Sequence, residues 1–263
     1  MLLPSVYMKY GISHLSIIPL RIEASHKSEM VSQLLFGETF SVIKEQKDWL
    51  QIECSFDNYQ GWMDAAQFHE LTEKDYQTIT ENNCGVAMDL SGTAASGSDS
   101  VPIVAGSSLP FFDGMNLKIG KEKFIYNGQS VTADGKTNAL LERVAMRYLN
   151  APYLWGGRSP FGIDCSGFTQ LVFKFMNLKL KRDAYLQAEQ GVIVNFIEEA
   201  VPGDLAFFNN EEGKIIHVGI ILKDNKIIHA SGKVRLDKLD HFGIHNTSTK
   251  KYTHQLKIIK RLL

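Results

Sequence analysis

The chain has 263 residues, of which 44% are hydrophobic and 22% charged, and its formal net charge at pH 7 is -1. This is the composition of an ordinary globular protein, without the basic excess typical of nucleic-acid binding. No apolar run is long enough to span a membrane. The length exceeds what one compact core usually needs, so we expect two or three domains.

The number of cysteines and the N-terminal residues indicate the cellular compartment of the protein. The three cysteines are an odd number, which argues against a disulfide framework and fits the reducing cytosol. A secretory signal needs a continuous apolar core, whereas Pro4, Lys9, His14 and Arg21 interrupt the apolar residues here. We therefore expect an extended N-terminal arm and a strand, in a cytoplasmic protein. If a signal peptide had been removed, the protein would instead be periplasmic or secreted.

The first half of the chain has the pattern of small barrels. Residues 1–72 carry short apolar runs separated by turn residues, which predicts a first all-β barrel with an N-terminal arm. Residues 73–135 continue this pattern more weakly and predict a second barrel. Turn signals lie at Gly37, Lys47-Asp48 and Asp57-Asn58 in the first region, and at Asp113-Gly114 and Asn127-Gly128 in the second.

Residues 136–263 differ in character and predict an α+β domain, with helices first and a sheet after them. Apolar residues recur at helical spacing in two segments, one on each side of a glycine-rich loop. Helices are expected over residues 138–150, from Cys165 onward and from Asp183 to Gly191, and strands over residues 203–208, 214–222 and 226–231.

Cys165 lies where the glycine-rich loop becomes a helix. The first turn of a helix presents free N–H groups and the positive end of the helix dipole, which lower a thiol pKa and favour the nucleophilic thiolate. The Cys165 N–H is also able to donate to an oxyanion. The alternative is a buried structural cysteine, with Asp164 as the N-cap of the helix. The glycines expected to leave the backbone open to a substrate carbonyl are Gly156, Gly157, Gly162 and Gly167.

Two histidines occur in the same frame, IIH, in successive predicted strands. His217 would take the thiol proton, and His229 would fix the tautomer of His217. A two-residue turn between the strands would place the two rings on opposite faces, because side chains alternate. We therefore predict a three-residue loop or a bulge, which sets His229 opposite Gly219 and within reach of His217. The alternative for each ring is a hydrogen-bonded core histidine.

The other histidines suit surface or turn positions better than ligand positions. No CxxC or HExxH spacing occurs, so zinc is not expected and no cofactor is implied. These histidines are His14, His26, His69, His241, His245 and His254.

Four segments, YLWGGRSPFGIDCSGF, PGDLAFF, HVGIIL and IIHAS, resemble in order and spacing the NlpC-type papain-like cysteine peptidases of bacteria. The resemblance covers roughly residues 138–260. It implies a catalytic triad of Cys165, His217 and His229. The N-terminal part resembles the bacterial SH3-like domains that often precede such a catalytic domain. The implied fold class is an α+β papain-like domain preceded by two small all-β SH3-like barrels.

This layout also resembles the γ-D-glutamyl-L-diamino acid endopeptidases, or dipeptidyl-peptidase VI. The likeness implies a cysteine peptidase that hydrolyses the bond between D-glutamate and a diamino acid, lysine or diaminopimelate, in murein peptides with a free N-terminal L-alanine. Such an enzyme serves cell-wall peptide recycling or degradation. The alternatives are an amidase or acyltransferase on the same scaffold and a non-catalytic cell-wall-binding protein.

The resemblance further implies residues that bind substrate. Asp183 matches a carboxylate that pairs with the substrate α-amine, although it would equally cap the helix that follows. Ala184 stands where relatives often carry serine, which removes one hydrogen bond to substrate. Tyr59 and Glu29 resemble residues of the first SH3-like domain that close the amine end of the pocket, with a barrel-surface role as the alternative.

Four residues near the thiol complete the implied set. Trp155, Asp164 and Ser166 match pocket-lining positions, and core packing is the alternative for Trp155. Tyr153 either assists the oxyanion or simply packs.

Overall fold

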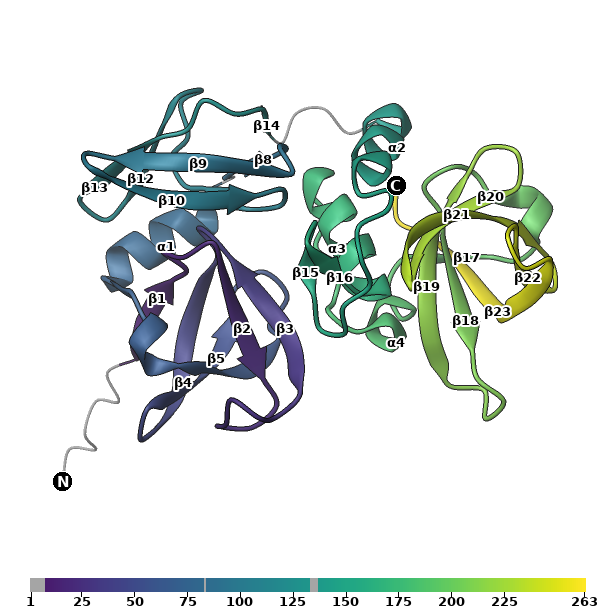
Figure 1. Cartoon of the computed structure of the whole chain (residues 1–263), viewed down its shortest axis with the longest axis horizontal. Coiled ribbons are helices and arrows are strands. Elements are labelled where there is room, and N and C mark those ends of the chain that lie inside the picture. The colour runs from purple at the N-terminus through teal and green to yellow at the C-terminus, as the bar shows by residue number, and fades with distance from the viewer. Residues whose placement is uncertain (1–7, 83, 133–136) are drawn as a thin grey trace. The chain divides into compact units, whose positions relative to one another are not determined.

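The computed structural model describes residues 8–82, 84–132 and 137–263 (Figure 1). The chain divides into two compact units, Met1–Thr132 and Ala133–Leu263. The predicted N-terminal arm begins on residues 1–7, and the predicted boundary between residues 135 and 136 falls within residues 133–136. Both therefore lie outside the described residues.

The first part of unit 1 is a seven-stranded antiparallel sheet, with the strand order β3-β2-β6-β5-β4-β1-β7. Alternate residues are buried along β5, as expected for a strand with one face on a core. The core inside the curled sheet includes Ile18, Phe40, Ile52 and Met63. The strands are β1 (Tyr10–Ile12), β2 (Ile17–Arg21), β3 (Met30–Leu35), β4 (Thr39–Gln46), β5 (Trp49–Cys54), β6 (Gln60–Asp64) and β7 (Glu70–Leu71), with a short 3-10 helix at Ala65–Gln67.

The turns predicted in this sheet are confirmed. Gly37, Lys47 and Asn58 have φ angles of 77°, 52° and 61°, the left-handed conformation that tight turns require. Lys47 lies in the hairpin between β4 and β5, where Gln46 pairs with Trp49. The turn chemistry therefore sets the register of this hairpin, as the sequence indicates.

A helix, α1 (Glu73–Glu81), lies where the sequence analysis expected strands to continue, so that expectation was wrong at this point. Thr72 caps the helix: its hydroxyl accepts from the Asp75 N–H at 3.1 Å and donates to the Asp75 carboxylate at 2.8 Å. This arrangement is close to a capping box, with aspartate where glutamate is usual. The spacing of Thr72 and Asp75 in the sequence is a signal for this helix start.

The second part of unit 1 consists of two small sheets. One has the strand order β10-β9-β13-β12 and the other β11-β8-β14. Gly114, in the predicted turn before β12, has a φ of 106°. The strands are β8 (Gly85–Ala87), β9 (Ser91–Ser96), β10 (Asp99–Val104), β11 (Ser108–Leu109), β12 (Asn116–Ile119), β13 (Glu122–Ile125) and β14 (Ser130–Val131).

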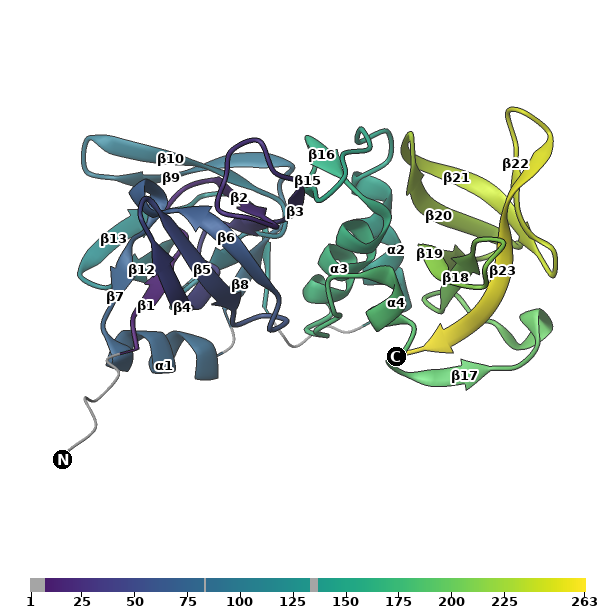
Figure 2. The same ribbon diagram turned by 90° about the horizontal axis from the view of Figure 1, so that it is seen from below.

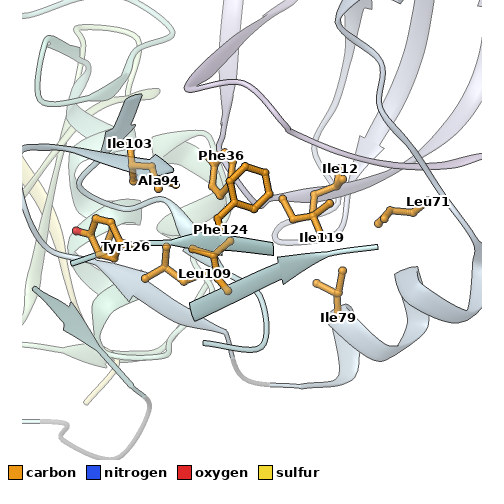
Figure 3. Close-up of a cluster of buried hydrophobic side chains, with 12 residues drawn as sticks. Ile12, Phe36, Leu71, Ile79, Ala94, Ile103, Leu109, Ile119, Phe124 and Tyr126 are labelled. Carbon is orange, nitrogen blue, oxygen red and sulfur yellow. The ribbon is translucent and has the colours of Figure 1, made fainter. Parts of the chain in front are cut away.

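One hydrophobic core joins the two parts of unit 1 (Figure 3). Ile12 and Phe36 come from the first sheet and Ile79 from α1, and they pack with Ile119 and Phe124 of the second part. The rings of Phe36 and Phe124 lie edge to face at 5.7 Å. His14 reinforces the junction, because its Nε2 lies 2.8 Å from the Glu122 carboxylate. Unit 1 is therefore held together by a shared interior.

Unit 2 packs helices against one side of a sheet. Helix α3 (Cys165–Phe175) contacts α2 (Asn138–Arg147), β19 (Ile215–Leu222) and β20 (Lys226–Ser231). In Figure 1 and Figure 2 the helices α2, α3 and α4 (Ala184–Gln187) lie together beside the strands. This confirms the predicted helix pair and the expected order of helices before sheet. Across the described residues, no helix is both long and apolar enough to cross a membrane.

The sheet of unit 2 has seven strands, where the sequence analysis expected three. Its order is β17-β23-β18-β19-β20-β21-β22, and β22 also pairs with β23. The sequence analysis expected no strand after residue 231, and this was wrong, because β21, β22 and β23 lie there. The further elements are β15 (Arg158–Ser159), β16 (Gly162–Ile163), β17 (Val192–Val194), the 3-10 helix Ile197–Glu199, β18 (Leu205–Asn209), β21 (Lys233–Asp240), β22 (Gly243–Asn246) and β23 (Lys251–Arg261).

Candidate active site

Cys165 is the first residue of α3, as the sequence predicts. Asp164 is the N-cap of this helix, and its carboxylate accepts from the Gly167 N–H at 2.7 Å. The helix starts here because the cap satisfies one of the free N–H groups of the first turn. The Cys165 N–H, at the first helical position, is not taken up by a carbonyl of the helix. The sulfur and this N–H are therefore presented together at the beginning of α3.

The Asp164 carboxylate is also the centre of a buried ion pair. Arg182, whose side chain is 1% exposed, donates to both oxygens of Asp164, at 3.0 and 2.6 Å. The same guanidinium donates to the Ser166 hydroxyl at 2.9 Å, and the Gly156 N–H donates to Asp164 at 2.9 Å. Removing one partner from such a pair typically costs about 3–5 kcal/mol. The network therefore fixes the loop on which Cys165 stands.

The glycines around Cys165 serve packing within the loop. A Cβ on Gly157 would lie 2.4 Å from the Gly162 carbonyl oxygen, and a Cβ on Gly167 would lie 2.4 Å from the Gly157 carbonyl oxygen. Side chains at these positions are therefore excluded by the loop's own backbone. This is a different reason from the open approach to substrate that the sequence analysis expected.

The Cys165 thiol is buried, with 7% of the residue exposed. Burial and the neighbouring Asp164 charge raise the pKa of Cys165 to about 12, although the backbone N–H groups of Val218 and Ser166 oppose this by donating to the sulfur. The expectation of a lowered pKa was therefore wrong in the resting protein, because burial outweighs the helix terminus. The contact with the N–H of Val218, the residue that follows His217, places the sulfur against β19.

His217 and His229 lie as the predicted register requires. Gly219 pairs with His229 and Leu222 with Lys226, so the loop between β19 and β20 has three residues. The His217 Nε2 lies 2.8 Å from the His229 Nδ1, and the rings are nearly perpendicular at 85°. Because Nε2 of His217 is engaged with His229, Nδ1 is the nitrogen left for a reaction with the thiol. The prediction of the offset is confirmed.

Burial sets the charge of His217. Its surroundings and the nearby His229 and His254 rings lower the pKa of His217 well below its usual range. The imidazole is therefore neutral near pH 7, and the thiol beside it is protonated. Such a pair is suited to general-base catalysis, in which the proton leaves the sulfur as the bond to substrate forms.

Two residues at this site were missed by the sequence analysis. The His254 ring, on β23, stacks on His217 with centroids 4.2 Å apart, whereas the sequence analysis gave it a surface role. Burial lowers the pKa of His254 to about 4. Asp237, on β21, lies 3.1 Å from the His229 Nε2. Both reach the site through strand pairings that the sequence analysis did not expect, so no local signal marked them.

Tyr153 lies within electrostatic range of Cys165, whereas Asp183 stands at the start of α4. Burial, and the neighbouring Cys165 and Asp164, raise the pKa of Tyr153 to about 12, so its phenol keeps its proton and is able to donate. Asp183 precedes α4, but its carboxylate makes no side-chain cap bond; instead it hydrogen-bonds the Tyr185 side chain. The side-chain capping role of Asp183 is therefore wrong.

The remaining predicted residues differ in their exposure. Trp155 is 61% exposed, so the core-packing alternative is wrong for it. Ser166 is buried and tied to Asp164 and Arg182. Tyr59 and Glu29 belong to unit 1: Tyr59 packs beside the core of the first sheet, and Glu29 is exposed. Their roles in binding substrate stay predictions.

The arrangement in unit 2 is chemically specific. It combines a thiol at a helix N-terminus, a neutral imidazole and a second imidazole that is hydrogen-bonded to the first. These three groups correspond to a nucleophile, a general base and a residue that orients the base. Over the part of the chain that the structure describes, no group of three or more His, Cys, Asp or Glu side chains is placed to hold a metal ion.

Comparison with known proteins identifies relatives for both units. The model of the NlpC/P60 family matches residues 150–257, and that of the bacterial dipeptidyl-peptidase SH3 domain matches residues 20–68. The chain is 31% identical over 217 residues to the gamma-D-glutamyl-L-lysine dipeptidyl-peptidase of Bacillus subtilis strain 168, which covers 76% of this chain and 71% of that protein. A Bacillus cereus ATCC 10987 protein of the same name is 25% identical over 230 residues, covering 78% and 68%.

Solved structures agree at the level of the fold. The crystal structure of an NlpC/P60 family protein from Bacillus cereus ATCC 10987 superposes with a TM-score of 0.80 at 19% identity, covering 96% of this chain and 99% of that one. An NlpC/P60 endopeptidase from Photobacterium damselae subsp. piscicida gives a TM-score of 0.71 at 16% identity, covering 95% and 70%. An NlpC/P60 catalytic domain and an SH3 domain are thus both present. The chain belongs to the NlpC/P60 family and is a cysteine peptidase.

Proposed function

We propose that this peptidase hydrolyses the bond between D-glutamate and the following diamino acid in murein peptides with a free N-terminal L-alanine. The observation that carries the proposal is the hydrogen bond between His217 and His229, together with the Cys165 sulfur that accepts from the N–H of Val218, the residue after His217. The names of the Bacillus relatives, gamma-D-glutamyl-L-lysine dipeptidyl-peptidases, support the choice of bond.

In the first half of the proposed reaction, Cys165 is the nucleophile and His217 the base. Nδ1 of His217 takes the thiol proton as the sulfur attacks the γ-glutamyl carbonyl carbon. The carbonyl oxygen becomes an oxyanion that the Cys165 N–H stabilises, with the protonated Tyr153 phenol as a second donor. His217 then gives its proton to the leaving amine, so that the C–N bond breaks and a thioester remains.

In the second half, water releases the acyl group. The neutral His217 takes a proton from water, the hydroxide attacks the thioester, and the proton passes to the departing sulfur. His229 keeps the His217 ring in the orientation that both halves need, through the bond of 2.8 Å between them. The enzyme returns to the neutral thiol and imidazole pair with which it began.

Recognition of the free amine is assigned to Asp183. A carboxylate that pairs with the ammonium of L-alanine in a partly dry site selects strongly for an unblocked terminus. Trp155, which is 61% exposed beside the loop of Cys165, is proposed as a wall of the pocket. Tyr59 and Glu29 are proposed to close its amine end, and the region after residue 72 is proposed to be a second SH3-like barrel.

The purified protein should therefore cleave L-Ala-γ-D-Glu-L-Lys, or its diaminopimelate counterpart, and should fail on the same peptide acetylated at its N-terminus. Products are identified by mass spectrometry. Cys165→Ala should abolish turnover, because the nucleophile is lost. Cys84→Ser is the matched control, since Cys84 lies in unit 1, and it should keep full activity.

Two outcomes would contradict different parts of the proposal. Turnover that persists in Cys165→Ala would remove the thiol from the mechanism. Equal cleavage of the free and the acetylated peptide would leave the peptidase chemistry in place and remove the selection for a free amine.

A further inference from the structure

Asp237 is a buried carboxylate to which the catalytic scheme above gives no role. It lies on β21, whose residue Arg235 pairs with His229 of β20. Its side chain is fully buried, and its Oδ2 lies 3.1 Å from the His229 Nε2. A hydrogen-bonded chain thus runs from His217 through His229 to Asp237. The group at the outer end of this hydrogen-bonded chain is a carboxylate. When ionised it only accepts hydrogen bonds, whereas each nitrogen of an imidazole either donates or accepts, depending on the tautomer.

The other contacts of Asp237 keep it ionised. Its Oδ1 accepts from the Thr247 N–H at 2.8 Å, from the Thr247 hydroxyl at 3.0 Å and from the Arg235 Nη2 at 3.0 Å. Burial alone would raise the pKa of Asp237, but the bonds from His229, Thr247 and Arg235 outweigh it and hold the pKa well below its usual range. At neutral pH this side chain is therefore an acceptor only.

Because Asp237 only accepts, it determines which nitrogen carries the proton in both His229 and His217. His229 must place its proton on Nε2 to donate to Asp237, so its Nδ1 is bare. The bare Nδ1 accepts from His217, which must carry its proton on Nε2. Nδ1 of His217 is then left with its lone pair, the form that is able to take a proton from Cys165. With the opposite set of tautomers, His217 would have a proton on Nδ1 and would not act as a base.

We propose that Asp237 is a positioning residue that selects the reactive tautomer of His217 by acting through His229. It extends the triad of the proposed function to a fourth member and rests on that function for its catalytic consequence. The tautomers themselves exist without substrate, so they are measured separately.

Asp237→Asn is a sharp test because the surroundings decide how the amide lies. Three donors, two from Thr247 and one from Arg235, hydrogen-bond the Oδ1 position and favour the carbonyl oxygen of asparagine there. At Oδ2 the Arg235 Nε lies 2.7 Å away in an ion pair but makes no hydrogen bond among the described residues. The amide NH2 then faces the His229 Nε2, which must become an acceptor. His229 carries its proton on Nδ1, donates to His217, and leaves His217 protonated on Nδ1. The isosteric variant thus reverses the direction of donation in both hydrogen bonds, and with it the tautomers of both histidines.

The first readout is 15N NMR of the histidine rings in the substrate-free protein, in which a bare nitrogen resonates far downfield of a protonated one. In the wild type, Nδ1 of both His217 and His229 should be bare, and in Asp237→Asn both should be protonated. The same spectrum from wild type and variant, or a wild-type His229 protonated on Nδ1, would overturn the proposal.

The second readout is the reactivity of Cys165 with iodoacetamide, which needs no peptide. Asp237→Asn should lower this rate by about 10²-fold, because the base that assists deprotonation is lost. Asp240→Asn is the matched control, a carboxylate on the same strand that bonds the Phe242 N–H, and it should leave the rate unchanged. An equal fall in both variants would contradict a role specific to Asp237.

The third readout is peptide hydrolysis, in which Asp237→Asn should lower kcat by about 10³-fold or more with little change in KM. Asp237→Ala should lower kcat less than Asp237→Asn does, because alanine removes the preference for the reactive tautomer without imposing the opposite one. A merely structural carboxylate predicts the opposite order, since asparagine keeps the shape. If the wild type cleaves no murein peptide, the proposed function fails, while the NMR and alkylation results still decide the role of Asp237.

Discussion

At the scale of single residues, the protonation of Cys165 and His217 distinguishes this site from one with a preformed ion pair. The thiol has a raised pKa and the ring a lowered one, and burial is the first cause in both cases. The uncharged pair costs less to bury than a thiolate and an imidazolium would. Charge then develops only when substrate arrives and oxyanion donors are engaged.

The rate of alkylation of Cys165 by iodoacetamide should therefore keep rising with pH through pH 8–9. A raised thiol pKa means that the thiolate fraction grows only as the pH approaches about 12. The measurement follows modification of Cys165 by mass spectrometry in a protein with Cys54 and Cys84 replaced by serine. A plateau of reactivity already at acidic pH would indicate a preformed thiolate and would contradict this expectation.

The sequence identifies the reacting groups but not their electrostatics. Cys165 is recognisable because a glycine loop precedes a helical stripe, and the two histidines because they share one frame. The burial of the two histidine rings depends on β21 and β23. These strands bring Asp237 to His229 and His254 to His217 from distant positions in the sequence. Polar and charged residues alternate along these strands, so neither residue is distinguishable from a surface residue before the sheet is known.

At the scale of elements, the register between β19 and β20 decides whether the two rings meet. Gly219 stands opposite His229, and a Cβ at Gly219 would lie 2.7 Å from Ile227 Cδ1 and 2.9 Å from His229 Cβ. The absence of a side chain thus lets the backbone of His229 come close enough for the bond to His217. This register is predictable from the sequence because a two-residue turn would place the rings on opposite faces, whereas a three-residue loop or a bulge places them on one face.

Gly219→Ala should lower kcat/KM by about 10²-fold, because the new methyl group displaces His229 and small misplacements of catalytic groups are costly. Steady-state kinetics on the murein tripeptide measure the effect. The control is Gly213→Ala in the turn before β19, where a Cβ meets open space and the only cost is the backbone strain of a φ of 80°. Full activity in Gly219→Ala would show that the register tolerates a displacement of the ring.

At the scale of the whole molecule, unit 1 has a shared core where the sequence indicated two barrels in tandem. The spacing of strands is readable, but which buried side chains meet is not, because Ile12, Phe36 and Phe124 lie far apart along the chain. Unit 2, by contrast, has its own core around α3 and the central strands. The two units are therefore expected to unfold as separate cooperative blocks.

Phe124→Ala in the full chain should destabilise unit 1 by about 3–5 kcal/mol, because the ring is buried against Phe36 and His14. Hydrogen exchange should show lost protection in β1–β7 and β8–β14 alike, with β18–β23 unaffected. The counterpart, Phe173→Ala in α3, should have the reverse pattern. Loss confined to β8–β14 in Phe124→Ala would instead support two independent barrels.

The position of β23 has a consequence for biosynthesis. This strand is translated after every other described strand of its sheet, yet it lies between β17 and β18 and carries the ring that stacks on His217. A nascent chain that already contains the thiol and both imidazoles thus still lacks an interior strand of its catalytic sheet. Since domains generally fold as units, peptidase activity should appear only after residue 261 has been translated and has emerged.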